Sequence, residues 1–525
     1  MKRYLSLLTA ILMLGAMLSG CADKSQSSSK DTASADSSDT SSAVTTTADD
    51  DNSDAEGEKI PDPVVTLPVK EEQIINETPA TYESFGIDKS EKLAFREDAA
   101  DGVKLPIINI TTNNEEIVSV EEYISCVVDV FNCDEEQILD EASAGVKVRG
   151  NSSAFYGDVQ QILRNTVPYR IKFDKKTNML GMNSGAECKS WVLLKSDWDL
   201  IRNDIAFRFG RTIIGDNTFC SDSRFVHLYV NDKFRGIYVL CEQSQINPNR
   251  VDVTEPEAGY TDTDIGYYLE LDNYAMSDSD NHYITLDYGE YEVTDIQGTT
   301  RKFVPAEYSI KNDLYSQNQI DFIDKYLNGV FEIVYRACEK GEYLTFDENY
   351  DLVDSQFDNA ADTVGAVMDL QSVVDMYLLY ELVHDYDCGE GSFYMCVDFA
   401  KGARYPRLTF TSPWDFNWAY NDSTSKYWAG AFTEQSFVNQ YGDRSNPWFI
   451  LLIKQDWFFD MAAQKWSQLV SEDAIMNCIR EETDILEEYH DDLSRTEEWA
   501  TDSAYELLKW IYKRISWMTD TFAAS

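Results

Sequence analysis

Two acidic segments in the second half of the chain have the residue types and spacing that phosphoryl transfer requires. His384-Asp385-Tyr386-Asp387 follows an apolar helical run, and Trp414-Asp415-Phe416-Asn417 closes a later strand–turn–strand piece. One carboxylate can accept the proton of an attacking hydroxyl, and the other can hold a divalent cation against phosphate oxygens. Aspartate beside a helix or a turn often serves only as a cap. With 93 acidic residues in the chain, spacing alone does not decide between these roles.

A basic segment in the first half could bind the phosphates that such chemistry needs. The turn Arg149-Gly150-Asn151-Ser152-Ser153 is followed by Lys172 in an apolar strand. A glycine turn with small hydroxylated residues can direct backbone N–H groups at phosphate oxygens, and a strand-borne lysine can reach the same oxygens. A solvated turn followed by an alternating polar strand position is the structural alternative.

Strands and turns should position the basic segment. Short apolar runs separated by turn residues predict a β-rich first half. A helix is predicted after Asp197, ending at Gly215, and Asn231-Asp232 predicts a hairpin turn. The strands are expected within residues 104–128, 145–153, 168–173, 190–195, 224–242 and 266–272.

Helices should position the acidic segments. Apolar residues recur at helical spacing in residues 320–338 and 370–385, and three more amphipathic helices are expected between 446 and 521. A strand–turn–strand piece over 392–418 lies between them, so that Asp387 precedes it and Asp415 ends it. The chain is therefore expected to be an α+β protein with a β-rich lobe followed by a helical lobe.

The charge of the chain argues against two classes of partner. Its 93 acidic and 44 basic residues give a formal net charge of −49. A surface of that sign repels nucleic acid and anionic lipid headgroups, so no nucleic-acid partner is expected. The same abundance of carboxylates weakens any argument for a metal site that depends on acidic residues alone.

The cysteines leave the redox state open. Nine of the ten cysteines follow Cys21, no C-x-x-C pair occurs, and histidine is scarce, so a structural zinc site is not expected. Disulfides are typical of an oxidising compartment, whereas a strict anaerobe could keep the same residues as buried thiols.

The start of the chain has the pattern of a secretory signal. Met1-Lys2-Arg3 is basic, residues 4–18 are almost wholly apolar, and Leu18-Ser19-Gly20-Cys21 resembles a bacterial lipobox. The resemblance implies lipidation at Cys21 and a mature protein anchored outside the cytoplasmic membrane. The alternatives are an ordinary secretory signal and a cytosolic protein with an apolar start. The following Ser-, Thr- and Asp-rich residues are too polar to form a core and should act as a tether.

The folded part resembles the spore coat protein H (CotH)-like kinases. The resemblance lies in KVRGNSS, PYRIKF, KSWVLLKSDWDLIRNDIAFRFG, FVHLYVNDKFRGIYVLCEQ, GYYLELD, the Asp387 loop, SPWDFNWAY and the closing KWIYKRISWM, in that order. It covers roughly residues 95 to 521. The family implies an atypical protein-kinase-like fold with two lobes, which uses ATP and a divalent metal to phosphorylate Ser or Thr of secreted or surface proteins.

The resemblance also implies roles for individual residues. Asp387 is similar to the catalytic base and Asp415 to the metal-binding aspartate, with Asn417 assisting the metal. Lys172 is similar to the phosphate-binding strand lysine. Phosphate and nucleotide binding is expected to extend to Arg149, Asn151, Ser152, Glu242 and Arg202, with Arg202 and Asn203 lining the cleft or bracing Lys172.

One position departs from the family pattern. Family members usually carry Asn five residues after the catalytic Asp, whereas this chain has Ser392 before Phe393-Tyr394. A serine hydroxyl is a shorter and weaker Mg²⁺ ligand than an amide carbonyl, which puts the second metal position in doubt.

The expected organisation and function follow from these patterns together. The predicted parts are a signal peptide (1–20), a disordered tether (21–90), a β-rich N-lobe (91–318), a C-lobe (319–440) and a C-terminal helical extension (441–525). The leading hypothesis is a lipid-anchored extracytoplasmic protein Ser/Thr kinase that uses ATP with Mg²⁺ or Mn²⁺. The alternative is a weak or inactive kinase-like protein of surface adhesion or assembly, with aromatics such as Trp414 and Trp428 contacting glycans or protein. A carbohydrate-active enzyme with paired carboxylates is a third possibility.

Overall fold

The computed structural model describes residues 64–67, 74–150, 154, 166–195, 200–272, 275–277, 282–287, 291–303, 305–385, 387–420, 423–432, 445–495 and 498–523. All of them belong to one compact unit, Pro63–Ser525. The expectations for the signal peptide, for Cys21 and for most of the tether lie outside the described residues, as do those for Asn151 and Ser152.

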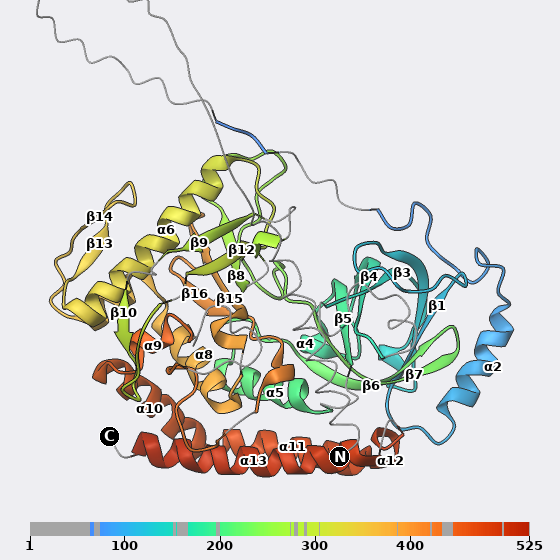
Figure 1. Ribbon diagram of the computed structural model, residues 1–525. Helices are drawn as coiled ribbons and strands as arrows, with labels where there is room; N and C mark the ends of the chain where they lie inside the picture. Colours follow the sequence, from blue (N-terminus) through green and yellow to red (C-terminus); the bar gives the residue numbers. More distant parts are fainter. Residues whose placement is uncertain are drawn as a thin grey trace, which may run out of the picture. The chain divides into compact units, whose positions relative to one another are not determined.

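The first half of the unit forms a closed seven-stranded barrel in the order β1-β2-β3-β4-β5-β7-β6 (Figure 1). Neighbouring strands pair antiparallel except β1 and β6, whose parallel pairing closes the barrel. The strands are β1 (Ile107–Thr112), β2 (Ile124–Phe131), β3 (Leu139–Val148), β4 (Tyr169–Thr177), β5 (Cys188–Lys195), β6 (Ser223–Val230) and β7 (Lys233–Glu242).

Alternation along β4 shows how the barrel is filled. Tyr169, Ile171 and Phe173 are buried in the barrel core, whereas Arg170 and Lys172 are partly exposed on the other face. β5 differs because Ser190 to Leu194 are all buried, as its continuous apolar run predicts. The predicted hairpin is also confirmed, because Asn231 and Asp232 adopt positive φ angles of 51° and 63° between β6 and β7.

A segment that the sequence assigned to the tether packs on the barrel. Tyr82 is 1 % exposed and its hydroxyl donates to the Asp129 carboxylate, while α2 (Lys89–Ala100) is tied to the β6–β7 turn by the Lys92–Asp232 ion pair of 2.7 Å. The acidic, Pro-containing composition of this stretch gave no sign of packing, because a small cluster supplies it, in which Ala80 and Tyr82 pack against Val127.

The second sheet joins strands from both halves of the chain. Its order is β16-β15-β8-β12-β9, and every pair is antiparallel. The strands are β8 (Gly266–Asp272), β9 (Tyr283–Leu286), β12 (Ala306–Ile310), β15 (Gly391–Asp398) and β16 (Thr409–Thr411). Two small ribbons, β10 (Glu292–Thr294) with β11 (Thr300–Lys302) and β13 (Leu344–Phe346) with β14 (Leu352–Asp354), complete the β structure of the described residues.

The α+β class is confirmed. The expected kinase-like two-lobe fold is not, because the strands of the first half form a closed barrel. The barrel takes the strands up to residue 242, and β8, β9 and β12 form a second sheet with the late β15–β16 hairpin, in which β8 pairs with β15. Local patterns predict strands well and their distant partners poorly, since antiparallel pairing of β8 with β15 depends on residues more than 100 positions apart.

Helices surround the second sheet. The predicted helix before Gly215 is α5 (Arg202–Ile214), and both predicted helices of the second half are present as α6 (Gln317–Tyr335) and α8 (Leu370–Val383). α6 begins with a capping box formed by Ser316 and Gln319. The other helices are α4 (Met182–Gly185), α7 (Ala360–Val367), α9 (Phe449–Leu452), α10 (Asp456–Ser471), α11 (Ala474–Glu488), α12 (His490–Leu493) and α13 (Glu498–Ala523).

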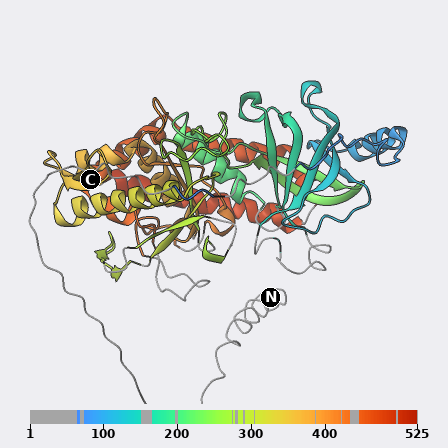
Figure 2. The same ribbon diagram turned by 90° about the horizontal axis from the view of Figure 1, so that it is seen from above.

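The long C-terminal helix α13 packs against α10 and α8 (Figure 2). Within the described residues, no helix combines the length and apolar character needed to cross a membrane. The nine cysteines after Cys21 are free thiols, six of them buried.

Candidate active site

The β15–β16 hairpin brings the two acidic segments to the same edge of the second sheet. Tyr394 of β15 pairs with Thr411 of β16, so the start of β15 lies beside the end of β16. Asp387 precedes β15 in a single 3₁₀ turn (Asp387–Gly389), and Asp415 follows β16 before a second one (Phe416–Trp418). The sequence prediction that a hairpin carries both carboxylates is therefore confirmed.

Buried hydrogen bonds fix the loop that carries Asp387. α8 ends at Val383, and the next residue, His384, adopts a left-handed conformation with φ of 53° and stacks on Trp428 at 4.7 Å between ring centroids. The Trp428 indole N–H donates to the Asp385 carbonyl at 2.7 Å, and the Tyr420 N–H donates to the Val383 carbonyl at 2.6 Å. The loop is thus tied to the segment that follows Asp415.

Gly389 is required where this loop meets the segment before α9. A Cβ atom at Gly389 would lie 2.6 Å from the Ser445 carbonyl carbon and 2.9 Å from the Asn446 nitrogen. Backbone cannot yield as a flexible side chain can, so this close approach admits only glycine. The Asn446 side chain also donates to the Cys388 carbonyl at 2.7 Å.

Asn203 of α5 holds the loop that carries Asp415. Its Oδ1 accepts from the Phe416 N–H at 3.0 Å, and its Nδ2 donates to Asn417 Oδ1 at 2.5 Å. Asp415 itself has a positive φ of 61°, a conformation that costs free energy in a residue with a side chain and is often found at functional sites. Asn203 is 3 % exposed, so these two bonds form away from water.

Arg202, the neighbour of Asn203, braces the same loop. Its Nη1 donates to the Ala419 carbonyl, and its guanidinium lies 6.0 Å from the Tyr420 ring centroid. The sequence analysis expected Arg202 and Asn203 to line the cleft or to brace Lys172. The described contacts of both residues are with the Asp415 loop.

The two carboxylates influence each other strongly. Burial raises the pKa of Asp387 well above its ordinary value, and the charges of Asp415 and Glu390 raise it further. Burial also raises the pKa of Asp415, while the charge of Arg149 acts to lower it. Both residues are partly exposed. Like charges held this close favour a proton or a cation between them.

Arg149 is the basic residue at the centre of this site. Its guanidinium lies 5.2 Å from the ring centroid of Trp414, the residue before Asp415. The charge of Arg149 also acts to lower the pKa of Cys241 and of Tyr394, although burial raises both pKa values overall. The Arg149 N–H donates to the Pro168 carbonyl at 3.0 Å, and Gly150 follows with a φ of 91°. The turn at the end of β3 thus directs a cation from the barrel to the aspartate pair.

Lys172 lies on the barrel wall, opposite Gly145 of β3 and Ser190 of β5. It neighbours Lys147, whose pKa is lowered by burial and by the charges of Arg170 and Lys172. Arg170, two residues before Lys172, is in turn influenced by the charges of Arg149 and Arg250. A run of cations therefore extends from Lys172 toward Arg149 along β4, and the role of Lys172 stays a prediction.

Glu242 ends β7 in a separate buried cluster. Its carboxylate accepts from Asn183 Nδ2 at 3.0 Å and from the Asp222 N–H at 3.1 Å, and it pairs with Arg250 Nε at 3.3 Å. Arg250 also lies 5.1 Å from the Trp191 ring centroid. Burial raises the pKa of Glu242 in spite of these partners. The cluster fixes the end of the strand.

The donor set suits a metal that arrives with phosphates better than one held by protein alone. Among the described residues, no group of three His, Cys, Asp or Glu side chains is arranged to hold a metal ion. Mg²⁺ in phosphoryl-transfer sites often uses only one or two carboxylates together with substrate phosphates and water. Asp387 and Asp415 fit that need, because a divalent cation between them would relieve their mutual repulsion.

The two remaining predicted metal ligands differ in their surroundings. Asn417 Oδ1 already accepts the hydrogen bond from Asn203, so its described contact is structural. Ser392 has a φ of 52° and lies at a β-bulge, where the pairing of β15 with β8 shifts between Gly391 and Phe393. A bulge re-aims a side chain and is typical of strand ends near active sites.

Sequence reasoning missed Glu390 and Arg250. Glu390 is 3 % exposed and adds a third acidic charge beside Asp387, and Arg250 neutralises Glu242 from the turn after β7. Neither residue stands in a recognisable pattern, since Glu390 follows a Cys-Gly pair and Arg250 lies in a loop. Their positions depend on tertiary contacts alone.

Comparison with known proteins adds one finding. Residues 146–333 match the model of the family described as CotH kinase protein. The matched region contains Arg149, Lys172, Arg202 and Glu242, whereas Asp387 and Asp415 lie beyond it. A search of curated proteins found no match. Over residues 146–333, the chain is therefore similar to the CotH kinase family, and the match supports a CotH-like kinase family member.

Proposed function

We propose that this protein is a CotH-type kinase that transfers the γ-phosphate of ATP to Ser or Thr of secreted or surface proteins. The observation that carries the proposal is the pairing of Asp387 and Asp415 at one sheet edge, with Arg149 beside them. A family match alone would support a kinase-like protein. The geometry supports the finer proposal, because it brings two carboxylates and one guanidinium together at one end of the hairpin.

Each of these residues has a distinct part in the proposed reaction. Asp387 accepts the proton of the substrate hydroxyl, for which a raised pKa is an advantage because it makes the carboxylate a stronger base. Asp415 would hold the metal, and ATP with Mg²⁺ or Mn²⁺ would supply the phosphoryl group and neutralise its charge. Arg149 contributes a fixed positive charge beside Asp415. Asn203 keeps Asp415 in its strained conformation.

We further propose that the protein works outside the cytoplasmic membrane, anchored by lipid at Cys21. The support is the order of basic, apolar and small residues before Cys21 and the polar segment after it. A single acyl chain binds membranes only weakly, so stable anchoring would need more than one chain. The Cys21→Ala variant is expected to leave the membrane fraction.

Phosphate transfer by the full-length protein tests the proposed function. Labelled ATP with Mg²⁺ or Mn²⁺ is offered together with Ser- and Thr-containing acceptor proteins, and incorporated label is measured. Transfer should fall by at least about 100-fold in Asp415→Asn, as for loss of a principal electrostatic group. Lys401→Gln, which changes an exposed lysine on a distant turn, is the control and should transfer like the wild type. Equal transfer by the Asp415 variant would refute the assignment.

The alternative is a protein of surface adhesion or assembly, which would have the same fold but would not need to bind nucleotide. Of the aromatics near Asp415 that it would use to contact glycans, Trp414, Tyr420 and Trp428 are at most 4 % exposed, whereas Trp418 is 37 % exposed. Nucleotide binding separates the two functions. A thermal shift with ATP and Mg²⁺ that requires Asp415 supports the kinase, and a flat response supports the alternative.

A further inference from the structure

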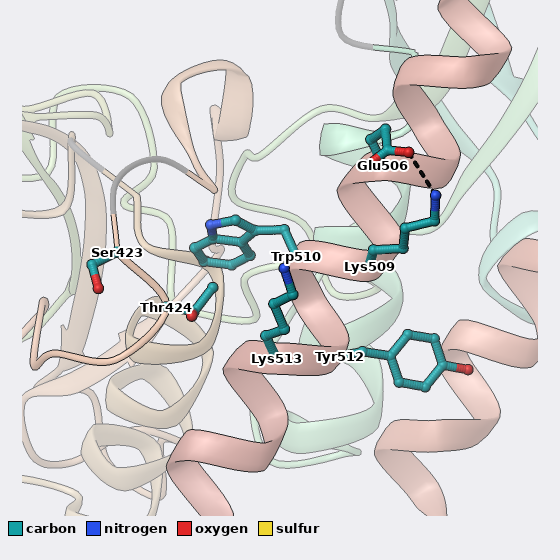
Figure 3. Close-up of a pocket in the computed structure, with 7 residues that line it drawn as sticks. All are labelled: Ser423, Thr424, Glu506, Lys509, Trp510, Tyr512 and Lys513. Atoms are coloured by element: carbon teal, nitrogen blue, oxygen red, sulfur yellow. Dashed lines mark hydrogen bonds and ion pairs between the residues drawn. The ribbon is translucent and has the colours of Figure 1, made fainter.

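A pocket of about 700 Å³ lies beside the candidate active site, between α13 and the segment that follows the Asp415 loop (Figure 3). It is lined by Ser423, Thr424, Glu506, Lys509, Trp510, Tyr512 and Lys513. None of these residues takes part in the proposed transfer.

The wall of this pocket is shared with both loops of the site. The Trp510 ring meets His384, where the Asp387 loop begins, at 5.3 Å, and Tyr420, where the Asp415 loop ends, at 5.8 Å. Both contacts are edge-to-face. A molecule that binds against Trp510 would thus contact a side chain that itself contacts both loops that carry the aspartates.

The chemistry of the pocket favours an anion. Figure 3 shows Trp510 extending from α13 toward Thr424, with the Lys513 ammonium beside it and Tyr512 pointing away. Lys509 is paired with Glu506 at 2.5 Å, whereas Lys513 is exposed and forms no ion pair or hydrogen bond with the described residues. In a chain of net charge −49, an exposed lysine that has no carboxylate partner in the described part of the chain is a distinct feature. Ser423 and Thr424 add hydroxyl groups to the lining of the pocket.

We propose that this pocket binds an anionic side chain of the acceptor protein close to the Ser or Thr that is phosphorylated. The inference rests on the proposed function, because it names the substrate class of that same site. An Asp or Glu carboxylate and a phosphoserine share the required chemistry, and Lys513 is the residue that recognises either one. The kinase would accordingly prefer acidic or already phosphorylated segments, even though its own surface is strongly acidic.

Peptide binding tests the inference without depending on catalysis. Four fluorescent peptides of equal length carry one acceptor Ser flanked by Asp, by phosphoserine, by Gln or by Lys. Their affinities for the full-length protein are measured by anisotropy at physiological salt. The Asp or the phosphoserine peptide should bind about five- to tenfold more tightly than the Gln peptide, as for one charge-assisted contact in a partly shielded site. Whichever of these two peptides shows the larger increase in affinity identifies the preferred anion, a carboxylate or a phosphate.

Charge reversal at the pocket provides the matched comparison. Lys513→Glu should abolish the preference for anionic peptides, whereas Lys401→Glu, which makes the same change at another exposed lysine, should keep it. Equal binding of all four peptides, a preference for the Lys peptide, or an unchanged preference in Lys513→Glu would overturn the proposal. Label transfer to the same peptides is followed in parallel. Transfer without any charge preference rejects the pocket and leaves the kinase, while preferential binding without transfer rejects the kinase and leaves the pocket.

Discussion

Arg149 connects the region that matches a known family with the aspartates that lie beyond it. It is the last residue before the glycine of the turn after β3, and it contacts Trp414 and influences Asp415. The sequence identified it only as part of a possible phosphate turn, with Lys172 as the main cation. Spacing could not show which of the two reaches the carboxylates, because the answer depends on how the barrel meets the second sheet.

Replacing Arg149 should therefore impair transfer directly. We expect Arg149→Gln to lower kcat/KM for ATP by about 100-fold, which corresponds to about 3 kcal/mol of lost stabilisation. Since Arg149 acts to lower the pKa of Asp415, its loss should raise that pKa and move the acid limb of the pH–rate profile to higher pH. Steady-state kinetics across pH 5–9 measure both effects.

Lys175→Gln is the matched control for this variant, because Lys175 is an exposed cation near the end of β4. It should leave both the rate and the pH profile unchanged. An Arg149→Gln enzyme with wild-type kinetics would show that the contact with Trp414 is structural and that another cation binds the phosphates.

Among the elements, the β15–β16 hairpin was the most predictable from the sequence, and the closure of the barrel was the least predictable. Alternating apolar runs, the Asn231-Asp232 turn and the helical spacing of α6 and α8 are local signals, and the structure has all of them. The closure of β1 against β6 and the pairing of β8 with β15 are distant contacts, to which no local pattern points. The positions of Asp387 and Asp415 were predictable because a hairpin joins them, whereas the positions of Glu390 and Arg250 were not.

α8, which leads into the Asp387 loop, has a titratable residue at its interface with α10. Asp375 is 1 % exposed, and burial raises its pKa to about 6 although Lys465 of α10 lies 3.2 Å away. The folded protein then binds a proton more tightly than the unfolded chain between about pH 4 and pH 6. This group should make the free energy of unfolding fall as pH rises through that window, by about 2 kcal/mol.

An uncharged side chain of the same shape should remove this dependence. In Asp375→Asn, the free energy of unfolding between pH 4 and pH 6 should fall less than in the wild type. The control is Asp460→Asn, at an exposed position of α10. Urea denaturation at several pH values measures the difference, and identical pH curves for the two variants would contradict the role of Asp375.

At the scale of the whole molecule, the C-terminal helices bind the barrel and the second sheet into one unit. The Asp492 carboxylate accepts from the N–H groups of Lys104 and Leu105, just before β1, at 2.7 and 2.8 Å. Arg514 of α13 forms a fully buried ion pair with Glu381 of α8 and donates to the carbonyls of Thr424 and Lys426. The segment expected to be an extension is thus part of the same core.

Removing one partner of a buried ion pair leaves the other charge without compensation. We expect Arg514→Met to lower the free energy of unfolding by about 3–5 kcal/mol, because Glu381 is also fully buried. Lys509→Met, which breaks an exposed pair with Glu506 on the same helix, should cost less than about 1 kcal/mol. Chemical denaturation compares the two variants, and similar losses would show that the buried pair contributes no more than the surface one.

The central claim is that Asp387 and Asp415 act as one unit on one phosphoryl group, and a double-mutant cycle of the transfer rate tests it most directly. Residues that act as a unit lose nearly all activity when either one is removed, so further removal costs little. Asp387→Asn, Asp415→Asn and the double variant should all transfer phosphate at nearly the same low rate, at least about 100-fold below the wild type. If either single variant retains most of its activity, or if the two losses multiply in the double variant, the aspartates do not serve one site.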